Sequence, residues 1–150
     1  MILWRVSNYE TLDGLGGLYV SGRWHTRGHH PVLYCTLNPA TALLETLVHS
    51  EIDSEDQPAG FKVLRIEGPD KLSIEKVEAA VLSPGWTEDM LFTQSIGDRW
   101  LSAGSSLLLQ VPSVLVPETW NVLVNPQHAE VNRLKITKTF KHAFDTRLFQ

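Results

Sequence analysis

Four residues of this 150-residue sequence combine a reactive side chain with a local pattern that could place it in a site: Arg23, Tyr34, Glu45 and Ser113. Arg23 follows a glycine in "VSGRW", and an Arg in such a loop can bind a phosphate or carboxylate through two parallel hydrogen bonds. Tyr34 lies in the apolar stretch "PVLYCTL", where its flat ring could stack on an aromatic ligand. In the functional interpretation, Arg23 would bind an anion and Tyr34 would contact an aromatic ligand.

Glu45 is the strongest candidate for a catalytic residue, because the segment around it, "ATALLETLVH", is otherwise almost uncharged. Its one titratable neighbour at helical spacing is His49, four residues later. A carboxylate in such a setting could line a cleft and serve as a base or hydrogen-bond acceptor. Ser113, in "VPSVLVP", lacks the Gly-x-Ser-x-Gly turn of a hydrolase nucleophile. We therefore interpret Ser113 as a ligand contact rather than a nucleophile.

Each of these residues also has a purely structural interpretation. Arg23 could be a surface residue whose stem covers an aromatic ring, and Tyr34 a core residue whose hydroxyl bonds to a neighbour. Glu45 could be a solvated charge on a polar helix face, and the Ser113 hydroxyl could bond to nearby backbone. Taken singly, the four residues do not decide between these interpretations.

The elements that would position Tyr34 and Glu45 follow each other directly. Residues 31–37 are apolar and partly β-branched, which predicts a strand, and a short first strand is predicted over residues 1–7. Asn38 and Pro39 then supply a helix N-cap and first helical residue. Glu45 and His49 share one face of this helix. An apolar stripe is predicted on another face, from Ala40, Leu43, Leu44, Leu47 and Val48.

The second half of the chain predicts several strands and one further helix. Residues 50–60 form an acidic loop before a strand over residues 61–67. Thr87 is expected to cap the helix, with Glu88 and Asp89 in its first turn and Gly97 weakening or dividing it. Its expected apolar face consists of Phe92, Ile96 and Trp100.

The last part of the chain completes a predicted α+β fold. Residues 105–117 indicate a strand pair interrupted by Pro112, and "WNVLVNP" indicates another strand. The aromatic residues of the closing "AFDTRLF" are expected to dock on the body of the protein. Strands outnumber helices without an alternating βαβ series, which favours mixed or antiparallel sheets forming a sandwich with a few short helices. "DGLGGLYVSG" is a turn or loop and not a dinucleotide fingerprint, because Tyr19 stands where the third glycine belongs.

Composition predicts one globular domain over residues 1–150, soluble and cytoplasmic. Hydrophobic residues make up 43% and charged residues 20%, and the formal net charge is −4. A protein that binds nucleic acid by neutralising phosphates is usually basic, so direct nucleic-acid binding is not expected. The N-terminal apolar run is too short for a signal peptide or a membrane span. Cys35 is expected to be a small buried hydrophobe, and the scattered histidines predict no metal site.

Four segments of the sequence together resemble the RES domain family, and the resemblance extends over essentially the whole chain. The segments are "GGLYVSGRWH", "PVLYCTLNPATALLETLVH", "LLLQVPSVLVPETWNVLVNPQH" and "FDTRLF". Within them Arg23, Tyr34, Glu45 and Ser113 match the family motifs. Arg5, in "LWRVS", also resembles a recurrent family arginine. The loop after Trp24, "TRGHHPV", is basic and rich in His and departs from the family pattern.

The resemblance implies a fold similar to the diphtheria-toxin-like ADP-ribosyltransferases and an activity on NAD⁺. Family members are toxins that hydrolyse or phosphorolyse the nicotinamide glycosidic bond, and some transfer ADP-ribose to a protein instead. By this resemblance Glu45 would orient the ribose, Arg23 would hold the pyrophosphate, Tyr34 would stack on nicotinamide, and Ser113 and Trp24 would contact the NAD⁺. NAD⁺ is then a substrate, and no metal is expected.

The resemblance also implies a protein partner. This would be an Xre-like antitoxin with a helix-turn-helix domain, one segment of which occupies the cleft and contacts Arg23. A homodimer stays open, since the sequence carries no distinct interface signal. Two alternatives remain: a transferase that modifies a target protein, and a binding module that has kept the fold without turnover.

Overall fold

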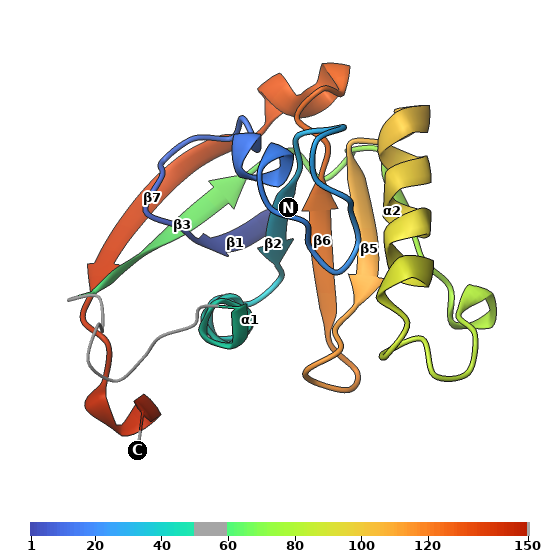
Figure 1. Ribbon diagram of the computed structural model, residues 1–150. Helices are drawn as coiled ribbons and strands as arrows, with labels where there is room; N and C mark the ends of the chain where they lie inside the picture. Colours follow the sequence, from blue (N-terminus) through green and yellow to red (C-terminus); the bar gives the residue numbers. More distant parts are fainter. Residues whose placement is uncertain (50–59, 150) are drawn as a thin grey trace.

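The computed structural model describes residues 1–49 and 60–149, and within these ranges seven strands form one twisted sheet (Figure 1). The strand order is β4-β5-β6-β2-β1-β3-β7, and every neighbouring pair is antiparallel except the parallel pair β4–β5. The strands are β1 (Ile2–Val6), β2 (Leu33–Thr36), β3 (Phe61–Glu67), β4 (Ile74–Lys76), β5 (Leu108–Pro112), β6 (Trp120–Val124) and β7 (Lys135–His142). The helices are α1 (Pro39–His49), α2 (Met90–Ala103) and the short 3₁₀ turns η1 (Leu15–Leu18), η2 (Ala79–Val81), η3 (Ala129–Arg133) and η4 (Thr146–Phe149).

The predicted α+β class with mixed strand pairing is confirmed. The strands expected to form a sandwich instead belong to one continuous sheet, because β1 pairs with both β2 and β3. The junction is narrow: β1 and β3 share five paired positions, whereas the ladder between β1 and β2 has one paired position among the described residues, Trp4 with Thr36. The two halves of the sheet therefore diverge from this point, and an opening forms beside it.

The sheet separates two hydrophobic clusters, and strand alternation assigns the side chains to them. On β2, Leu33 and Cys35 belong to one cluster, so Tyr34 between them faces the other way. On β6, Val122 and Val124 join the first cluster and Leu123 the second. The second cluster also receives the helix α2, which flanks β5 (Figure 1). The face that carries Tyr34 is therefore the face on which a site can form.

Helix α1 begins as predicted, but its buried face differs from the prediction. The side chain of Asn38 accepts the backbone N–H of Ala40 at 2.8 Å, which caps the helix. Of the expected apolar stripe, Leu44 and Val48 are exposed at 38% and 56%. The buried residue is Ala42, and it shares its face with Glu45 and His49. The expected stripe is wrong because the helix turns its smaller and more polar side toward the sheet.

Helix α2 begins two residues later than predicted and is not divided. Asp89, not Thr87, is the N-cap, and its carboxylate accepts the backbone N–H of Phe92 at 3.0 Å. Asp is as good an N-cap as Ser or Asn, and a cap at this position leaves Thr87 in the preceding turn. Gly97 lies in the uninterrupted helix, because its missing side chain lets the Trp24 carbonyl approach. A close packing contact therefore explains the glycine.

The buried face of α2 is more polar than predicted. Trp100 is buried as expected, and Ile96 packs partly against the core. The remaining buried positions are Thr93, Gln94, Gly97 and Leu101. The small and polar residues among them face a loop and not the sheet, so hydrophobic periodicity could not identify this face.

The C-terminal region follows the prediction in part. β5 ends at Pro112 and a turn follows, so the expected strand pair is one strand. Proline lacks the N–H that a continuing ladder would need. Phe144 docks on the body as predicted, with its ring centroid 4.6 Å from that of Phe61. Apart from Gly60, the predicted acidic loop lies outside the described residues.

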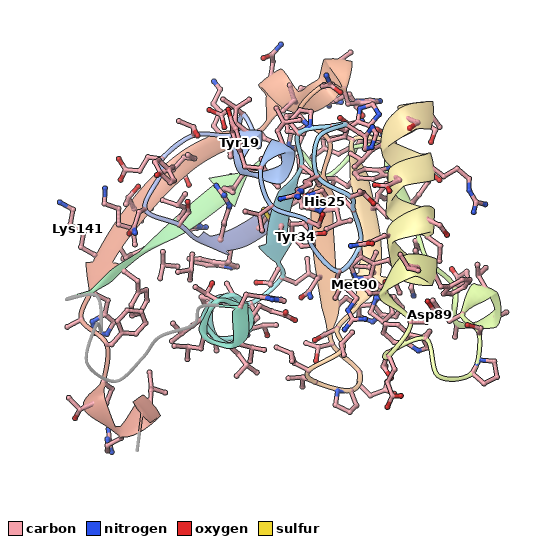
Figure 2. All side chains as sticks on the ribbon, viewed as in Figure 1. Tyr19, His25, Tyr34, Asp89, Met90 and Lys141 are labelled. Carbon is pink, nitrogen blue, oxygen red and sulfur yellow. The ribbon has the colours of Figure 1, made fainter. Side chains whose placement is uncertain are left out.

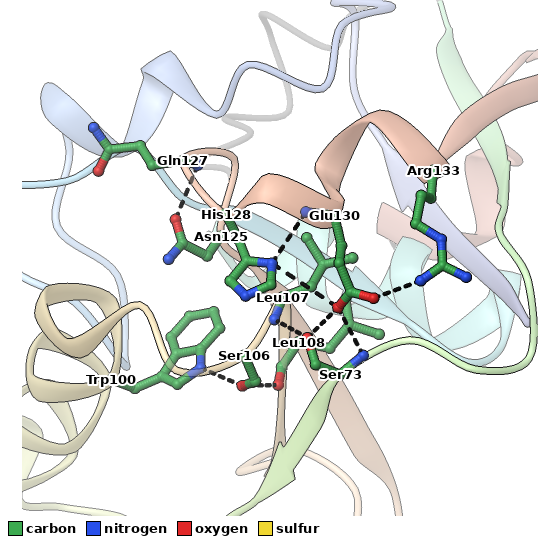
Figure 3. A network of polar contacts seen from close by, with 10 residues as sticks. All are labelled: Ser73, Trp100, Ser106, Leu107, Leu108, Asn125, Gln127, His128, Glu130 and Arg133. Atoms are coloured by element: carbon green, nitrogen blue, oxygen red, sulfur yellow. Dashed lines mark hydrogen bonds and ion pairs between the residues drawn. The ribbon is translucent and has the colours of Figure 1, made fainter.

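A polar network around Glu130 attaches the η3 turn to the body of the protein (Figure 3). The Glu130 carboxylate accepts the hydroxyl and the backbone N–H of Ser73 and forms an ion pair with Arg133. These partners, with the Ser73 bonds first, hold the pKa of Glu130 below its ordinary value. Ser73 in turn accepts the backbone N–H of Leu107, so the network connects η3 to the segment that enters β5. Its role is structural.

Candidate active site

A cleft of about 560 Å³ opens beside the β1–β2 junction. Its walls are β1 and β2, the polar face of α1, one residue of β6, and the segment from Gly16 to His25. Clefts of a few hundred Å³ are typical of sites for small molecules. The cleft brings together residues that are far apart in the sequence, among them Arg5, Arg23, Tyr34, Glu45 and Asn121.

The Glu45 carboxylate is held at the wall of this cleft by two donors on the same oxygen. The Ser113 hydroxyl donates to Oε1 at 2.9 Å, and the Asn121 side-chain amide donates to Oε1 at 2.7 Å. The other oxygen, Oε2, lies 3.7 Å from Nε2 of His49. The Glu45 side chain is 19% exposed, so the carboxylate is oriented and still accessible from the cleft.

Helix α2 holds the loop that carries Arg23. Thr93 donates its hydroxyl to the Arg23 carbonyl at 2.6 Å, and Gln94 donates its side-chain amide to the Gly22 carbonyl at 3.0 Å. Both donors come from the first two turns of the helix. Nη1 of Arg23 is buried and has no hydrogen-bond partner among the described residues. The backbone of the loop is therefore fixed, while its guanidinium retains capacity to bind an anion.

A second cation, Arg5, lines the same cleft. Burial lowers the pKa of the Arg5 guanidinium, an effect partly offset by Cys35 and Asp13. Arginine stays charged even with a lowered pKa. Cys35 itself is buried, as predicted. The cleft thus has two positive groups although the chain as a whole carries a net charge of −4.

The Tyr34 ring is fixed through its hydroxyl, and Figure 2 shows it beside His25. The backbone N–H of Gly22 donates to Nδ1 of His25 at 3.2 Å, so this nitrogen is the acceptor of the ring. The Tyr34 hydroxyl, 2.8 Å from the same atom, donates to it and accepts the backbone N–H of Trp24 at 3.1 Å. Nε2 of His25 then carries the hydrogen and donates to the Gly17 carbonyl at 3.0 Å. Burial raises the pKa of Tyr34, so the phenol stays neutral.

Comparison with known families decides the assignment of the chain, since the RES domain family matches residues 2–145. The chain belongs to the RES domain family. Its relatives have similar lengths. A Pseudomonas putida protein named "Toxin Res" is 48% identical, with 99% of this chain and 100% of that protein aligned. A Sphingobium protein named "Prs ADP-ribosylating toxin" is 34% identical, with 98% and 96% aligned.

A solved structure has the same fold as this RES domain. It is the Mycobacterium tuberculosis MbcT–MbcA toxin–antitoxin complex, one chain of which superposes with a TM-score of 0.72. The superposition covers 95% of this chain and 84% of that one, at 15% sequence identity. The likeness shows that this RES domain shares its fold with a chain of that complex.

The structure of the RES domain places the predicted residues in three different settings. Arg23, Tyr34 and Glu45 line one cleft, so they come together as the prediction requires. Ser113 lies behind Glu45 and reaches the site through the bond to that carboxylate. The Trp24 side chain is 2% exposed and belongs to the hydrophobic core, so only its backbone takes part in the site.

Sequence reasoning missed two residues of this site, Asn121 and His25. Asn121 is a polar residue in the apolar run "WNVLV", and register places it opposite Thr36 on the face that carries Tyr34. A lone amide in a buried strand is a signal that could have identified it. His25 was one of several scattered histidines, and its 2% exposure, which the sequence does not reveal, distinguishes it.

The described residues also bear on membranes and metals. Over residues 1–49 and 60–149, each helix is too short or too polar to cross a membrane. Over the same ranges, His, Cys, Asp and Glu side chains form no group of three or more that could hold a metal ion.

Proposed function

We propose that this RES domain is the toxin of a toxin–antitoxin pair and that it consumes NAD⁺ by breaking the nicotinamide N-glycosidic bond. The observation that carries the proposal is the oriented Glu45 carboxylate in a cleft that also contains two arginines and the Tyr34 ring. The names of the Pseudomonas and Sphingobium relatives support the toxin assignment. We place its action in the cytoplasm, with NAD⁺ as substrate.

Glu45 would act on the ribose. When the bond between C1′ and the nicotinamide nitrogen breaks, the electron pair leaves with nicotinamide and positive charge develops on the sugar. A carboxylate that is already oriented stabilises this charge without reorganising during the reaction. It would also accept a hydrogen bond from a ribose hydroxyl, which holds the sugar in position.

The cations and the aromatic ring of the cleft would bind the rest of the substrate. Arg23 would hold the pyrophosphate, because an unpaired buried N–H costs free energy that an anionic acceptor offsets. Arg5 would add to the positive potential on the same cleft. Tyr34 would present its ring to nicotinamide, and the bond of its hydroxyl to His25 fixes the plane of that ring.

The acceptor of the ADP-ribose group completes the reaction. Water would form a bond to C1′ and lose a proton, giving ADP-ribose, nicotinamide and H⁺, whereas inorganic phosphate would bond to the same carbon and give ADP-ribose phosphorylated there, together with nicotinamide. A protein side chain is the second candidate acceptor, which the name of the Sphingobium relative favours. The residues around Glu45 serve all three acceptors equally, since the glycosidic bond breaks in each case.

The antitoxin belongs to the proposal as well. Leu44 and Val48 are apolar and exposed on α1, outside the set of residues that line the cleft, and Leu37 is exposed just before the helix. Contiguous exposed apolar side chains are typical of protein interaction sites. We propose that an Xre-like helix-turn-helix antitoxin covers them and enters the cleft. Mutating Leu44 and Val48 to Ser should weaken this complex while NAD⁺ turnover persists, and unchanged affinity would exclude this surface.

The test is NAD⁺ loss by the purified protein, measured by chromatography with and without inorganic phosphate. We expect release of nicotinamide by the wild type and a decrease of about 100-fold or more in Glu45→Gln, because this variant loses the charge that stabilises the transition state. Glu88→Gln, an exposed substitution outside the cleft, is the matched control and should retain full activity.

The products distinguish the candidate reactions. Free ADP-ribose indicates hydrolysis, a phosphate-dependent product indicates phosphorolysis, and labelled protein in a cell extract indicates transfer. Near wild-type NAD⁺ loss by a folded Glu45→Gln variant would overturn the role of Glu45. No NAD⁺ loss by the wild type, with or without extract, would overturn the proposed function.

A further inference from the structure

We propose that Ser113 and Asn121 form a carboxylate clamp, a pair of positioning residues that hold one oxygen of Glu45 so that the other is directed to the substrate. The inference rests on the proposed function for its activity readout. It assigns to Asn121 a role that sequence reasoning did not find. It also assigns Ser113 to Glu45 and not to the bound substrate.

The hydrogen-bonding capacity of Ser113 is fully used within the protein. A serine hydroxyl has one hydrogen to donate and two lone pairs to accept with. Its hydrogen goes to Oε1 of Glu45 at 2.9 Å. Its oxygen accepts the backbone N–H groups of Leu115 and Val116 at 3.1 and 3.2 Å. These two backbone bonds fix the hydroxyl, so it can neither attack a substrate nor bind one without breaking an existing bond.

The orientation of Asn121 follows from its partner. A carboxylate can only accept hydrogen bonds, so the amide nitrogen of Asn121 must be the atom that faces Glu45, at 2.7 Å. The amide oxygen is then directed elsewhere, and it is buried with no hydrogen-bond partner among the described residues. An unsatisfied buried carbonyl lowers stability. The hydrogen bond of the amide nitrogen to the charged Glu45 carboxylate offsets part of that cost.

The strand register brings both donors to the same place. Val111 of β5 pairs with Asn121 of β6, and the ladder continues as the Ser113 N–H donates to the Thr119 carbonyl at 2.9 Å. Ser113 lies two residues after Val111, and strand alternation puts the two side chains on the same face of the sheet. Asn121 therefore comes from β6 and Ser113 from the position that directly follows β5, whereas Glu45 comes from α1. Two neighbouring strands and the residue after one of them thus hold a carboxylate that a helix supplies.

The two oxygens of Glu45 therefore have different roles. Oε1 receives both donors, whereas Oε2, on the side of His49, is the oxygen available to a ribose hydroxyl or a developing positive charge. Loss of one clamp donor would let the carboxylate rotate. The clamp therefore predicts a loss of kcat with little change in substrate binding.

The experiment compares Ser113→Ala and Asn121→Asp with matched controls, Ser95→Ala and Asn132→Asp, which are exposed and lie outside the cleft. We expect kcat for NAD⁺ to fall about 10- to 100-fold in each clamp variant, the range expected for a hydrogen bond to a charged group. The KM is expected to stay within about threefold. The control variants should match the wild type, and Ser113→Thr, which keeps the hydroxyl, should recover most of the activity.

A second arm combines Ser113→Ala with Glu45→Ala. If Ser113 acts through Glu45, the serine substitution costs little further activity once the carboxylate is absent, and the two substitutions are also non-additive in urea unfolding. A rise in KM with unchanged kcat would instead make Ser113 a substrate contact, and additive effects in unfolding would overturn the clamp.

The two arms separate this inference from the proposed function. The unfolding measurement needs no substrate, because the bonds to Glu45 exist in the unliganded protein. Coupling in unfolding without NAD⁺ loss by the wild type would overturn the proposed function and leave the clamp standing. NAD⁺ loss by the wild type, together with additive effects of the two substitutions on the free energy of unfolding, would overturn the clamp and leave the proposed function standing.

Discussion

Replacing Gly97 by Ala tests how α2 holds the Arg23 loop. A Cβ atom built on Gly97 would lie 1.6 Å from the Trp24 carbonyl oxygen and 2.8 Å from its carbonyl carbon. Real Cβ atoms essentially never approach within 3.0 Å of such atoms, so the loop or the helix must move by more than about 1 Å. The bonds from Thr93 and Gln94 to this loop resist that movement.

The magnitude follows from three terms of known size. Overpacking costs about 1–3 kcal/mol, and each hydrogen bond that the displaced loop loses adds about 1 kcal/mol. The better helix propensity of Ala offsets about 1 kcal/mol of this loss in stability. We therefore expect the free energy of unfolding to fall by about 2–4 kcal/mol and the Tm by roughly 5–15 °C. Displacing Arg23 by about 1 Å should also lower NAD⁺ turnover on the order of 100-fold.

Urea unfolding followed by tryptophan fluorescence measures the first effect, and NAD⁺ loss measures the second. Gly16→Ala is the matched control for stability, since a Cβ at that position meets nothing within 4 Å and the expected change is below about 0.5 kcal/mol. The result that would refute this reasoning is an increase in the free energy of unfolding. If helix propensity alone decided the outcome, Gly97→Ala would be more stable by about 1 kcal/mol and retain full activity.

Three further predictions concern single side chains. Asp89→Ala should lower the free energy of unfolding by about 1 kcal/mol in urea, because it removes the N-cap of α2; an unchanged midpoint would contradict the cap. Burial raises the pKa of Cys35 from 9.0 to about 12, so the unfolded chain releases this proton first as the pH rises. Stability should therefore fall between pH 9 and 12, with a contribution of up to about 1.4 kcal/mol per pH unit that is absent in Cys35→Ala; equal slopes would contradict it. Tyr34→Phe should cost about 1–3 kcal/mol, because it leaves His25 Nδ1 and a buried backbone N–H with fewer partners. A stability equal to the wild type would show that the hydroxyl does not fix the ring.

Local patterns predicted the elements that carry the site. Asn38 and Pro39 indicated where α1 begins, and the bond from Asn38 to Ala40 has the expected geometry. Residues 61–67 form the predicted strand, and Cys35 is buried as expected. These predictions succeeded because each depends on chemistry within a few residues, namely an N-cap, a β-branched run or a small apolar side chain.

The faces of the two helices show where local patterns fail. Leu44 and Val48 of α1 are exposed although their spacing predicted a buried stripe, and Thr93 and Gln94 of α2 are buried although they are polar. In both helices the buried face is set by what the rest of the chain places against it. The buried face of α1 is the one that borders the cleft. The buried face of α2 is the one that meets the Arg23 loop, whose backbone carbonyls need hydrogen-bond donors.

The sequence by itself determined the types of residue in the site and, through whole-chain resemblance, the RES domain family. Arg23, Tyr34 and Glu45 could be recognised because their side chains differ from the apolar segments around them. Only the tertiary structure decided which of them meet and how each is held. The bonds from Ser113 and Asn121 to Glu45 span 68 and 76 residues of sequence. Such contacts depend on strand register and on the approach of α1 to the sheet, which are properties of the whole fold and of no single segment.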